Sequence, residues 1–229
     1  MSRFSVICLD MAGTTVRDTG SVMDAFAAAI ASRNLPVTEF NSGMKYARAT
    51  MGQSKIEVFR HILGDEDEAR RANAAFETHY AAAVSLGEVA PMPGATEVFQ
   101  ACRGTGIKVC LATGFSPGTR DALVEALGWA DLVDLVLSPA DAGRGRPWPD
   151  LPLTALLRLG GGSVGELAVA GDTPSDVESG LRAGAGLVAG VLTGAATRQE
   201  LEAVPRAASL PGEPLVLDSI ADLLPRLGG

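Results

Sequence analysis

The feature that most constrains this chain is a short apolar run near its N-terminus that ends on a carboxylate. Residues Phe4–Leu9 are rich in Val, Ile and Phe, which is typical of a strand buried on both faces of a parallel sheet. Asp10 follows at once, and Gly13 then lets the chain turn. In open α/β sheets, the edge formed by the carboxyl ends of the strands is where ligands bind. Taken alone, Asp10 is better explained as a helix N-cap or a turn residue, so its role depends on the rest of the chain.

Composition limits the classes of partner. The 229 residues allow one large domain, or one domain plus a smaller one, and 47% of them are hydrophobic. A net charge of −8 disfavours binding to nucleic acid or to anionic lipid. We expect no signal peptide, no membrane span, and a cytoplasmic protein. The three cysteines, Cys8, Cys102 and Cys110, are expected to be small buried hydrophobes in a reducing compartment.

The order of the predicted elements indicates the fold class. Helices are predicted over 21–33, 65–86 and, as one or two helices, 44–63, with no convincing strand between residues 16 and 89. Beyond residue 94, helices over 96–103, 120–127, 151–159, 175–183 and 219–227 alternate with strands over 107–112, 132–137, 166–170, 187–192 and 214–217. Such alternation predicts a doubly wound parallel sheet. We therefore expect an α/β core of residues 1–16 and 90–229. An all-helical cap of residues 17–89 would be inserted above the sheet edge that carries Asp10.

Polar residues follow three of the predicted strands. The first strand ends at Asp10, the second at Thr113-Gly114, and the fourth runs into a GDTPSD segment that contains Asp172 and Asp176. Arg146 lies between the last two, in a Gly-Arg-Pro segment. Each residue alone could be a cap, a turn or a surface charge. Because the carboxyl ends of parallel strands share one edge, we expect the whole set to meet there.

This set of residue types predicts phosphoryl chemistry. The carboxylates of Asp10, Asp172 and Asp176 offer hard oxygens that suit Mg²⁺. Such an ion would offset the repulsion between a carboxylate nucleophile and an anionic substrate. Thr113, the backbone N–H of Gly114 and the Arg146 guanidinium can bind phosphoryl oxygens. Attack of a carboxylate on phosphorus would give an aspartyl-phosphate.

These motifs, in this order, resemble the haloacid dehalogenase superfamily, which has a Rossmann-like core. The resemblance implies that Asp10 is the nucleophile and that Mg²⁺ is held by Asp10, the backbone carbonyl of Ala12, and Asp172, with Asp176 close by. The position of Ala12 usually carries an aspartate that protonates the leaving oxygen. Because such acid catalysis is worth about 100- to 10,000-fold, Ala12 argues against an ordinary phosphomonoesterase or phosphomutase. The metal carboxylates argue against a dehalogenase.

Three segments are similar to the phosphonoacetaldehyde hydrolase (phosphonatase) branch: DMAGTT at 10–15, Gly145-Arg146-Pro147, and the Met-Gly-x-x-Lys stretch that ends at Lys55. The resemblance implies that Lys55 forms a Schiff base with the substrate aldehyde, so that the C–P bond breaks to an enamine. Independently, helical spacing places Lys55 on one face with Val58 and Phe59, at the end of an apolar stripe. A desolvated lysine is a better nucleophile, whereas the alternative is a lysine that snorkels from the helix edge.

Three positions depart from the phosphonatase pattern. Val58 replaces a histidine, Phe115 replaces a tyrosine, and Ser21 is the residue nearest to a missing cysteine. These changes favour a modified 2-oxoalkylphosphonate or another substrate. Our first hypothesis is a Mg²⁺-dependent C–P hydrolase that uses Asp10 and Lys55. The alternatives are a phosphatase acting on a small ester and a non-catalytic phosphate-binding protein. The resemblance also implies a homodimer formed through the cap.

Overall fold

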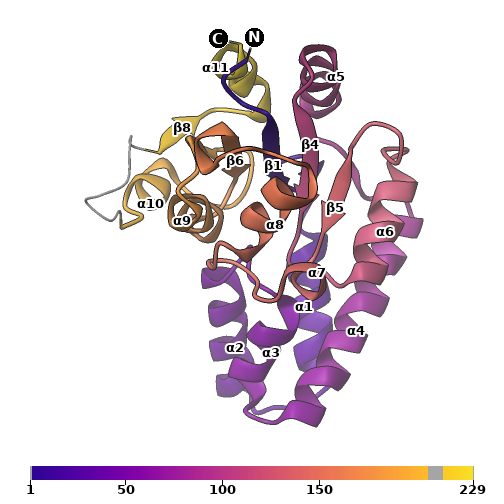
Figure 1. Cartoon of the computed structure of the whole chain (residues 1–229). Coiled ribbons are helices and arrows are strands. Elements are labelled where there is room, and N and C mark those ends of the chain that lie inside the picture. Colours follow the sequence, from indigo (N-terminus) through magenta and orange to yellow (C-terminus); the bar gives the residue numbers. More distant parts are fainter. Residues whose placement is uncertain (1, 206–213, 229) are drawn as a thin grey trace.

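A six-stranded parallel sheet forms the centre of the protein in a computed structural model that describes residues 2–205 and 214–228 (Figure 1). The strand order is β5-β4-β1-β6-β7-β8. The strands are β1 (Val6–Asp10), β4 (Lys108–Ala112), β5 (Leu135–Leu137), β6 (Leu167–Gly171), β7 (Leu187–Val191) and β8 (Leu215–Leu217). The predicted α/β class with a doubly wound parallel sheet is confirmed.

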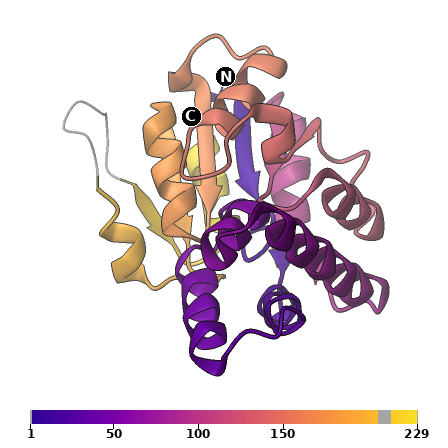
Figure 2. The same cartoon turned by 90° about the horizontal axis from the view of Figure 1, so that it is seen from below.

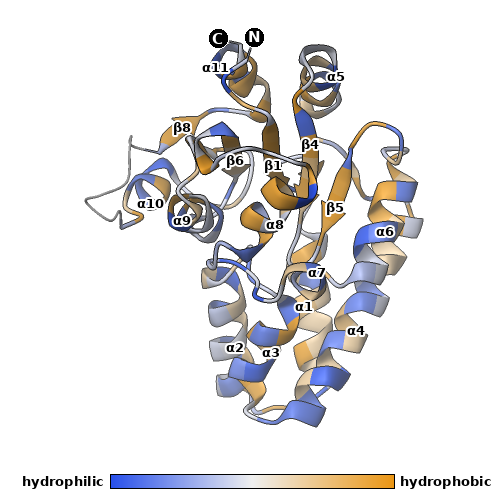
Figure 3. Cartoon of the chain, viewed as in Figure 1, coloured by the Kyte–Doolittle hydropathy of each residue, from blue (hydrophilic) through white to orange (hydrophobic). Residues whose placement is uncertain are grey.

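Helices cover both faces of this sheet because successive residues of its strands point to opposite sides. In β1, Ile7 and Leu9 belong to the core that includes α5, whereas Val6 and Cys8 belong to a second core with α8 and α9. The strands are accordingly apolar along most of their length, apart from charged residues at the start of β4 and the end of β1 (Figure 3). The helices of this part are α5 (Ala95–Thr105), α6 (Pro117–Ala126), α7 (Pro139–Ala142), α8 (Asp150–Arg158), α9 (Pro174–Ala183), α10 (Arg198–Glu202) and α11 (Leu224–Leu227), with 3₁₀ turns η1 (Val164–Glu166) and η2 (Ile220–Leu223).

Four helices form a block beyond the carboxyl ends of the central strands (Figure 1, Figure 2). They are α1 (Ser21–Ala31), α2 (Val37–Ala49), α3 (Lys55–Leu63) and α4 (Glu66–Ser85). Contacts among Phe26, Phe59 and Phe76, with ring centroids 4.8–6.1 Å apart, join α1, α3 and α4. Two short antiparallel strands, β2 (Val16–Arg17) and β3 (Ala90–Pro91), connect the block to the sheet. No described helix combines the length and the apolar content needed to cross a membrane.

The structure corrects several predicted elements. The helix expected from residue 44 begins at Val37. Its start was not predicted because α2 buries only Gly43 and Ala47, so its sequence has no strong apolar periodicity. A break over residues 50–54 separates it from α3. The short strand β2 lies in the region where none was expected, and α7 and α10 were not predicted. The strand expected over 132–137 begins only at Leu135, and the closing helix starts as the turn η2.

Candidate active site

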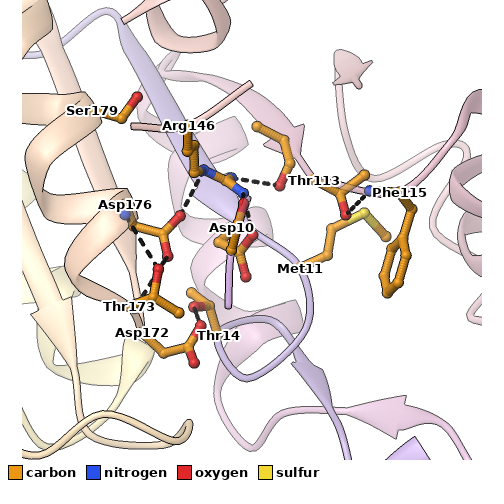
Figure 4. A network of polar contacts seen from close by, with 12 residues as sticks. Asp10, Met11, Thr14, Thr113, Phe115, Arg146, Asp172, Thr173, Asp176 and Ser179 are labelled. Atoms are coloured by element: carbon orange, nitrogen blue, oxygen red, sulfur yellow. Dashed lines mark hydrogen bonds and ion pairs between the residues drawn. The ribbon is translucent and has the colours of Figure 1, made fainter. Parts of the chain in front are cut away.

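Three aspartates from two neighbouring strands and one helix form a buried cluster at the carboxyl edge of the sheet (Figure 4). Asp10 is the last residue of β1, Asp172 directly follows β6, and Asp176 lies in the first turn of α9. One oxygen from each carboxylate lies within 4.8 Å of the other two. The structure therefore brings the three predicted metal-ligating side chains within reach of one ion.

Local hydrogen bonds orient two of these carboxylates. The Thr14 hydroxyl donates to Asp172 Oδ1 at 3.0 Å. Thr173 and Asp176 form a capping box at the start of α9, in which the Thr173 hydroxyl donates to Asp176 Oδ2 at 2.5 Å. Gly13 has φ +90°, and a Cβ there would lie 2.5 Å from Asp172 Oδ2. Only glycine lets the turn after β1 approach Asp172 so closely, which brings the backbone around Ala12 to the cluster.

Arg146 is the central cation of the cluster. Its Nη1 lies 2.8 Å from Asp10 Oδ1 and its Nε lies 2.6 Å from Asp176 Oδ1. Its Nη2 donates to the Ala112 carbonyl at 2.8 Å, and Nη1 also donates to the Gly52 carbonyl at 3.3 Å. The guanidinium thus holds the nucleophile candidate and a metal-ligand candidate in place. Its predicted contact with phosphate stays a prediction.

The charge of the cluster fits a divalent cation. Burial, reinforced by repulsion between the carboxylates, raises the pKa of Asp10 and of Asp172 above the usual range. Arg146 opposes this effect at Asp10. A divalent ion among these oxygens would favour the ionised carboxylates, and an all-oxygen donor set suits Mg²⁺. Asp10, Asp172 and Asp176 are the side chains that could hold it.

Lys55 is a buried amine in an aromatic environment. It is the first residue of α3 and only 6% exposed. Its Nζ lies 5.1 Å from the ring centroid of Phe115 and 5.7 Å from that of Phe26. Burial lowers the pKa of Lys55 to about 8, although the negative charge of Asp10 opposes the shift. Lys55 forms no ion pair with the described residues, so its amine is not committed to a carboxylate.

The segment between α2 and α3 carries Lys55 onto the sheet edge. The Lys55 backbone N–H donates to the Gly114 carbonyl at 3.2 Å. A Cβ on Gly114 would lie 2.3 Å from the Gln53 carbonyl, so glycine is needed for this approach. The buried Thr113 accepts a hydrogen bond from the Phe115 backbone N–H at 3.2 Å through its hydroxyl. Thr113 and Gly114 therefore both lie at the end of β4, where the predicted phosphate site requires them.

A crevice of about 910 Å³ opens between the helical block and the core. Its lining comes from α3 and α4 on one side and from the segments after β4 and β5 on the other. Lys55, Gly114 and Arg146 are part of its lining. Asp10 and Asp176 contact Arg146, and none of the three aspartates lines the crevice itself.

Two of the positions that depart from the phosphonatase pattern, Val58 and Phe115, carry apolar side chains. Val58 is buried in the core, and Ser21 donates to Glu88 at 3.5 Å. Phe115 stacks on Tyr80 of α4 with ring centroids 4.6 Å apart. Sequence reasoning missed Tyr80, which is fully buried and whose hydroxyl has no hydrogen-bond partner among the described residues. Tyr80 lies four residues after Phe76, and both are buried residues of α4.

Comparisons with known proteins identify relatives along most of the chain. The family model described as haloacid dehalogenase-like hydrolase matches residues 4–184. The probable phosphatase IndB of Dickeya dadantii is 29% identical over 204 residues, covering 86% of this chain and 85% of the relative. The phosphonoacetaldehyde hydrolase of Bacteroides fragilis is 28% identical, covering 90% and 84%. A phosphonoacetaldehyde hydrolase-like protein from Oleispira antarctica has a crystal structure that matches with a TM-score of 0.78 at 26% identity, covering 98% and 91%.

Proposed function

We propose a reaction for this chain, which belongs to the haloacid dehalogenase-like hydrolases. The reaction is hydrolysis of the C–P bond of a 2-oxoalkylphosphonate. Asp10 is the nucleophile in this proposal, and Lys55 is the amine that condenses with the substrate carbonyl. The observation that carries the proposal is the buried Lys55 amine beside Phe115, at a crevice that Arg146 also lines. The named phosphonoacetaldehyde hydrolases among the relatives support it.

Lys55 is suited to imine formation because a far larger fraction of its amine is neutral near physiological pH than in an ordinary lysine. With a pKa of about 8, about a tenth of the amine is unprotonated at pH 7, against less than about a thousandth for an ordinary lysine. The neutral amine adds to the substrate carbonyl, and loss of water leaves an iminium. The positive nitrogen lies two bonds from the carbon that carries phosphorus, so it can accept the electron pair of the C–P bond.

Asp10 then carries out the transfer. A carboxylate oxygen of Asp10 forms a bond to phosphorus as the C–P bond breaks, and the electron pair moves into the iminium to give an enamine. Water hydrolyses the aspartyl-phosphate to inorganic phosphate. The enamine takes up a proton and its imine is hydrolysed, which frees Lys55 and the carbonyl product. No alkoxide leaves in this sequence, which agrees with Ala12 at the position of the usual acid.

The charged groups around Asp10 have separate roles. Arg146 orients Asp10 and favours its ionised form. Asp10, the Ala12 carbonyl, Asp172 and Asp176 would hold Mg²⁺. When bound, Mg²⁺ would neutralise part of the charge that builds up between the carboxylate and the phosphoryl oxygens. Thr113 and the Gly114 N–H are the proposed donors to those oxygens.

The test is chemical trapping of Lys55. Borohydride added during turnover of phosphonoacetaldehyde and larger 2-oxoalkylphosphonates should reduce the imine and leave a stable adduct on the peptide that contains Lys55. Mass spectrometry identifies the adduct, and Lys45, an exposed lysine of α2, serves as the internal control. Lys55→Arg keeps the charge but cannot form an imine, so it should abolish phosphate release. Near wild-type release by this variant would overturn the Schiff-base mechanism.

A phosphatase is the second candidate. It is favoured by the absence of a polar side chain at Val58 and Phe115, which leaves proton transfer during imine formation unassigned, and by the similarity to a probable phosphatase. In that case Lys55 only binds the substrate, and Lys55→Arg retains ester hydrolysis.

Asp10→Asn should abolish phosphate release from phosphonates and esters alike, once deamidation is excluded. A variant that keeps more than a few per cent of the activity would exclude Asp10 as the nucleophile.

A further inference from the structure

We propose that the carbon part of the substrate ends in an uncharged polar group, such as a hydroxylated or amide-bearing chain, and is larger than acetaldehyde. This inference rests on the proposed function to the extent that the crevice at Lys55 is the substrate site. It deepens that function by stating which class of 2-oxoalkylphosphonate, or of ester in the phosphatase alternative, is the preferred substrate.

The size of the crevice is the first observation. Its 910 Å³ lies in the upper part of the range of about 300–1,000 Å³ that is typical of sites for drug-sized ligands. A two-carbon aldehyde at Lys55 would leave most of this volume to water. Asn73 of α4 and Trp148 belong to the lining together with Lys55.

Besides Arg146, two arginines line the crevice, and protein carboxylates already neutralise both. Arg60 pairs with Glu57 and, at 2.7 Å, with Glu66. Arg144 pairs with Asp150 at 2.9 Å. A substrate anion at either arginine would have to displace an existing partner. These arginines therefore do not provide a free site for a distal carboxylate or a second phosphate.

Glu77, on the acidic side of the crevice, is held by hydrogen bonds from neutral side chains and not by an ion pair with a described residue. Glu77 of α4 accepts hydrogen bonds from the hydroxyls of Ser116 and, at 3.1 Å, Thr119. It also accepts from the Asn73 amide at 3.2 Å. Glu77 thus links the helical block to the N-terminus of α6. A substrate ammonium would compete with these donors, so a cationic distal group is disfavoured as well.

Three uncharged side chains keep unused hydrogen-bonding atoms on the lining. The Gln53 amide and the Tyr46 hydroxyl make no hydrogen bond to other described residues, and Asn73 keeps its side-chain carbonyl free. Stacking on His61, with ring centroids 3.8 Å apart, fixes the Tyr46 ring. These groups offer donors and acceptors without net charge, which matches hydroxyl or amide groups on the substrate.

The experiment uses a matched series of 2-oxoalkylphosphonates and phosphate esters whose distal end is a methyl, a polyhydroxyl or amide, a carboxylate or an ammonium group. We expect kcat/KM for phosphate release to be about tenfold higher for the uncharged polar members than for the methyl member, since each neutral hydrogen bond contributes on the order of 1 kcal/mol. We expect the charged members to be the poorest. Binding of the same compounds to Asp10→Asn, measured by calorimetry, records the preference whether or not a bond is broken.

The double variant Gln53→Ala, Asn73→Ala should remove this preference: KM rises for the uncharged polar members, and the ratio of their kcat/KM to that of the methyl member falls to about one. Gln100→Ala on the exposed face of α5 is the matched control and should change neither. Equal or better use of the methyl or charged members would overturn the inference. If esters show the preference and no phosphonate is cleaved, the inference holds and the C–P hydrolase proposal fails.

Discussion

Lys55→Met should stabilise the protein, because folding places a lysine amine among aromatic rings without a carboxylate partner. Met has a similar length and no charge, so it keeps the contacts of the side chain with Phe26 and Phe115. The variant separates the energetic cost of the buried amine from its packing. It therefore tests the desolvation of Lys55 on which the proposed nucleophile depends.

The magnitude follows from the pKa of Lys55. A lysine with an ordinary pKa of 10.5 titrates at about 8 in the folded protein. Each tenfold change in proton affinity corresponds to about 1.4 kcal/mol, so the protonated amine costs about 3 kcal/mol at pH 7. Between pH 8 and 10.5 the unfolded chain binds more protons than the folded one, and stability rises with pH. The gain from Lys55→Met should thus be about 3 kcal/mol at pH 7 and should nearly vanish at pH 10.5.

The assay is urea unfolding of both proteins in EDTA at these two pH values. For a chain of this length, the gain at pH 7 corresponds to a rise in Tm of about 6–12 °C. Lys45→Met, at an exposed position of α2, should change the free energy of unfolding by less than about 0.5 kcal/mol. A gain below about 1 kcal/mol at pH 7, or an equal gain at pH 10.5, would refute the desolvation of Lys55.

Three further substitutions test other parts of the site. Ala12→Asp adds a proton donor beside the nucleophile. Phosphate-release assays should therefore show slower C–P cleavage and ester hydrolysis that is about tenfold or more faster. A change of both rates in the same direction would contradict this. Tyr80→Phe removes a buried hydroxyl without a partner and should raise the free energy of unfolding by about 1 kcal/mol in urea, whereas a loss would mean that the hydroxyl is bonded. Gly114→Ala sets a Cβ 2.3 Å from the Gln53 carbonyl and should lower kcat/KM about tenfold or more. Gly104→Ala, with open space around it, should leave kcat/KM unchanged.

Local patterns were sufficient for the parallel sheet and for the carboxylates at its edge. A buried strand, the residue that ends it and the turn that follows are neighbours in the chain, so Asp10 and Asp172 could be assigned to one edge before any contact was known. The position of Lys55 at the end of an apolar stripe was also predictable, because a helix of nine residues is long enough to separate an apolar face from a solvent-exposed one. The start of α2 was missed because an exposed helix leaves little apolar pattern to detect.

Contacts between distant segments were not accessible in this way. The ion pairs of Arg146 with Asp10 and Asp176 and the stacking of Phe115 on Tyr80 join residues 30 or more positions apart. The segment before α3 also contacts the end of β4, a distant part of the chain, and Gly114 permits this approach by having no Cβ. Sequence patterns carry information about faces and edges. Packing geometry decides which side chains pair by hydrogen bonds or charge across an edge of the sheet. Distance and desolvation select each partner, and its position in the chain does not.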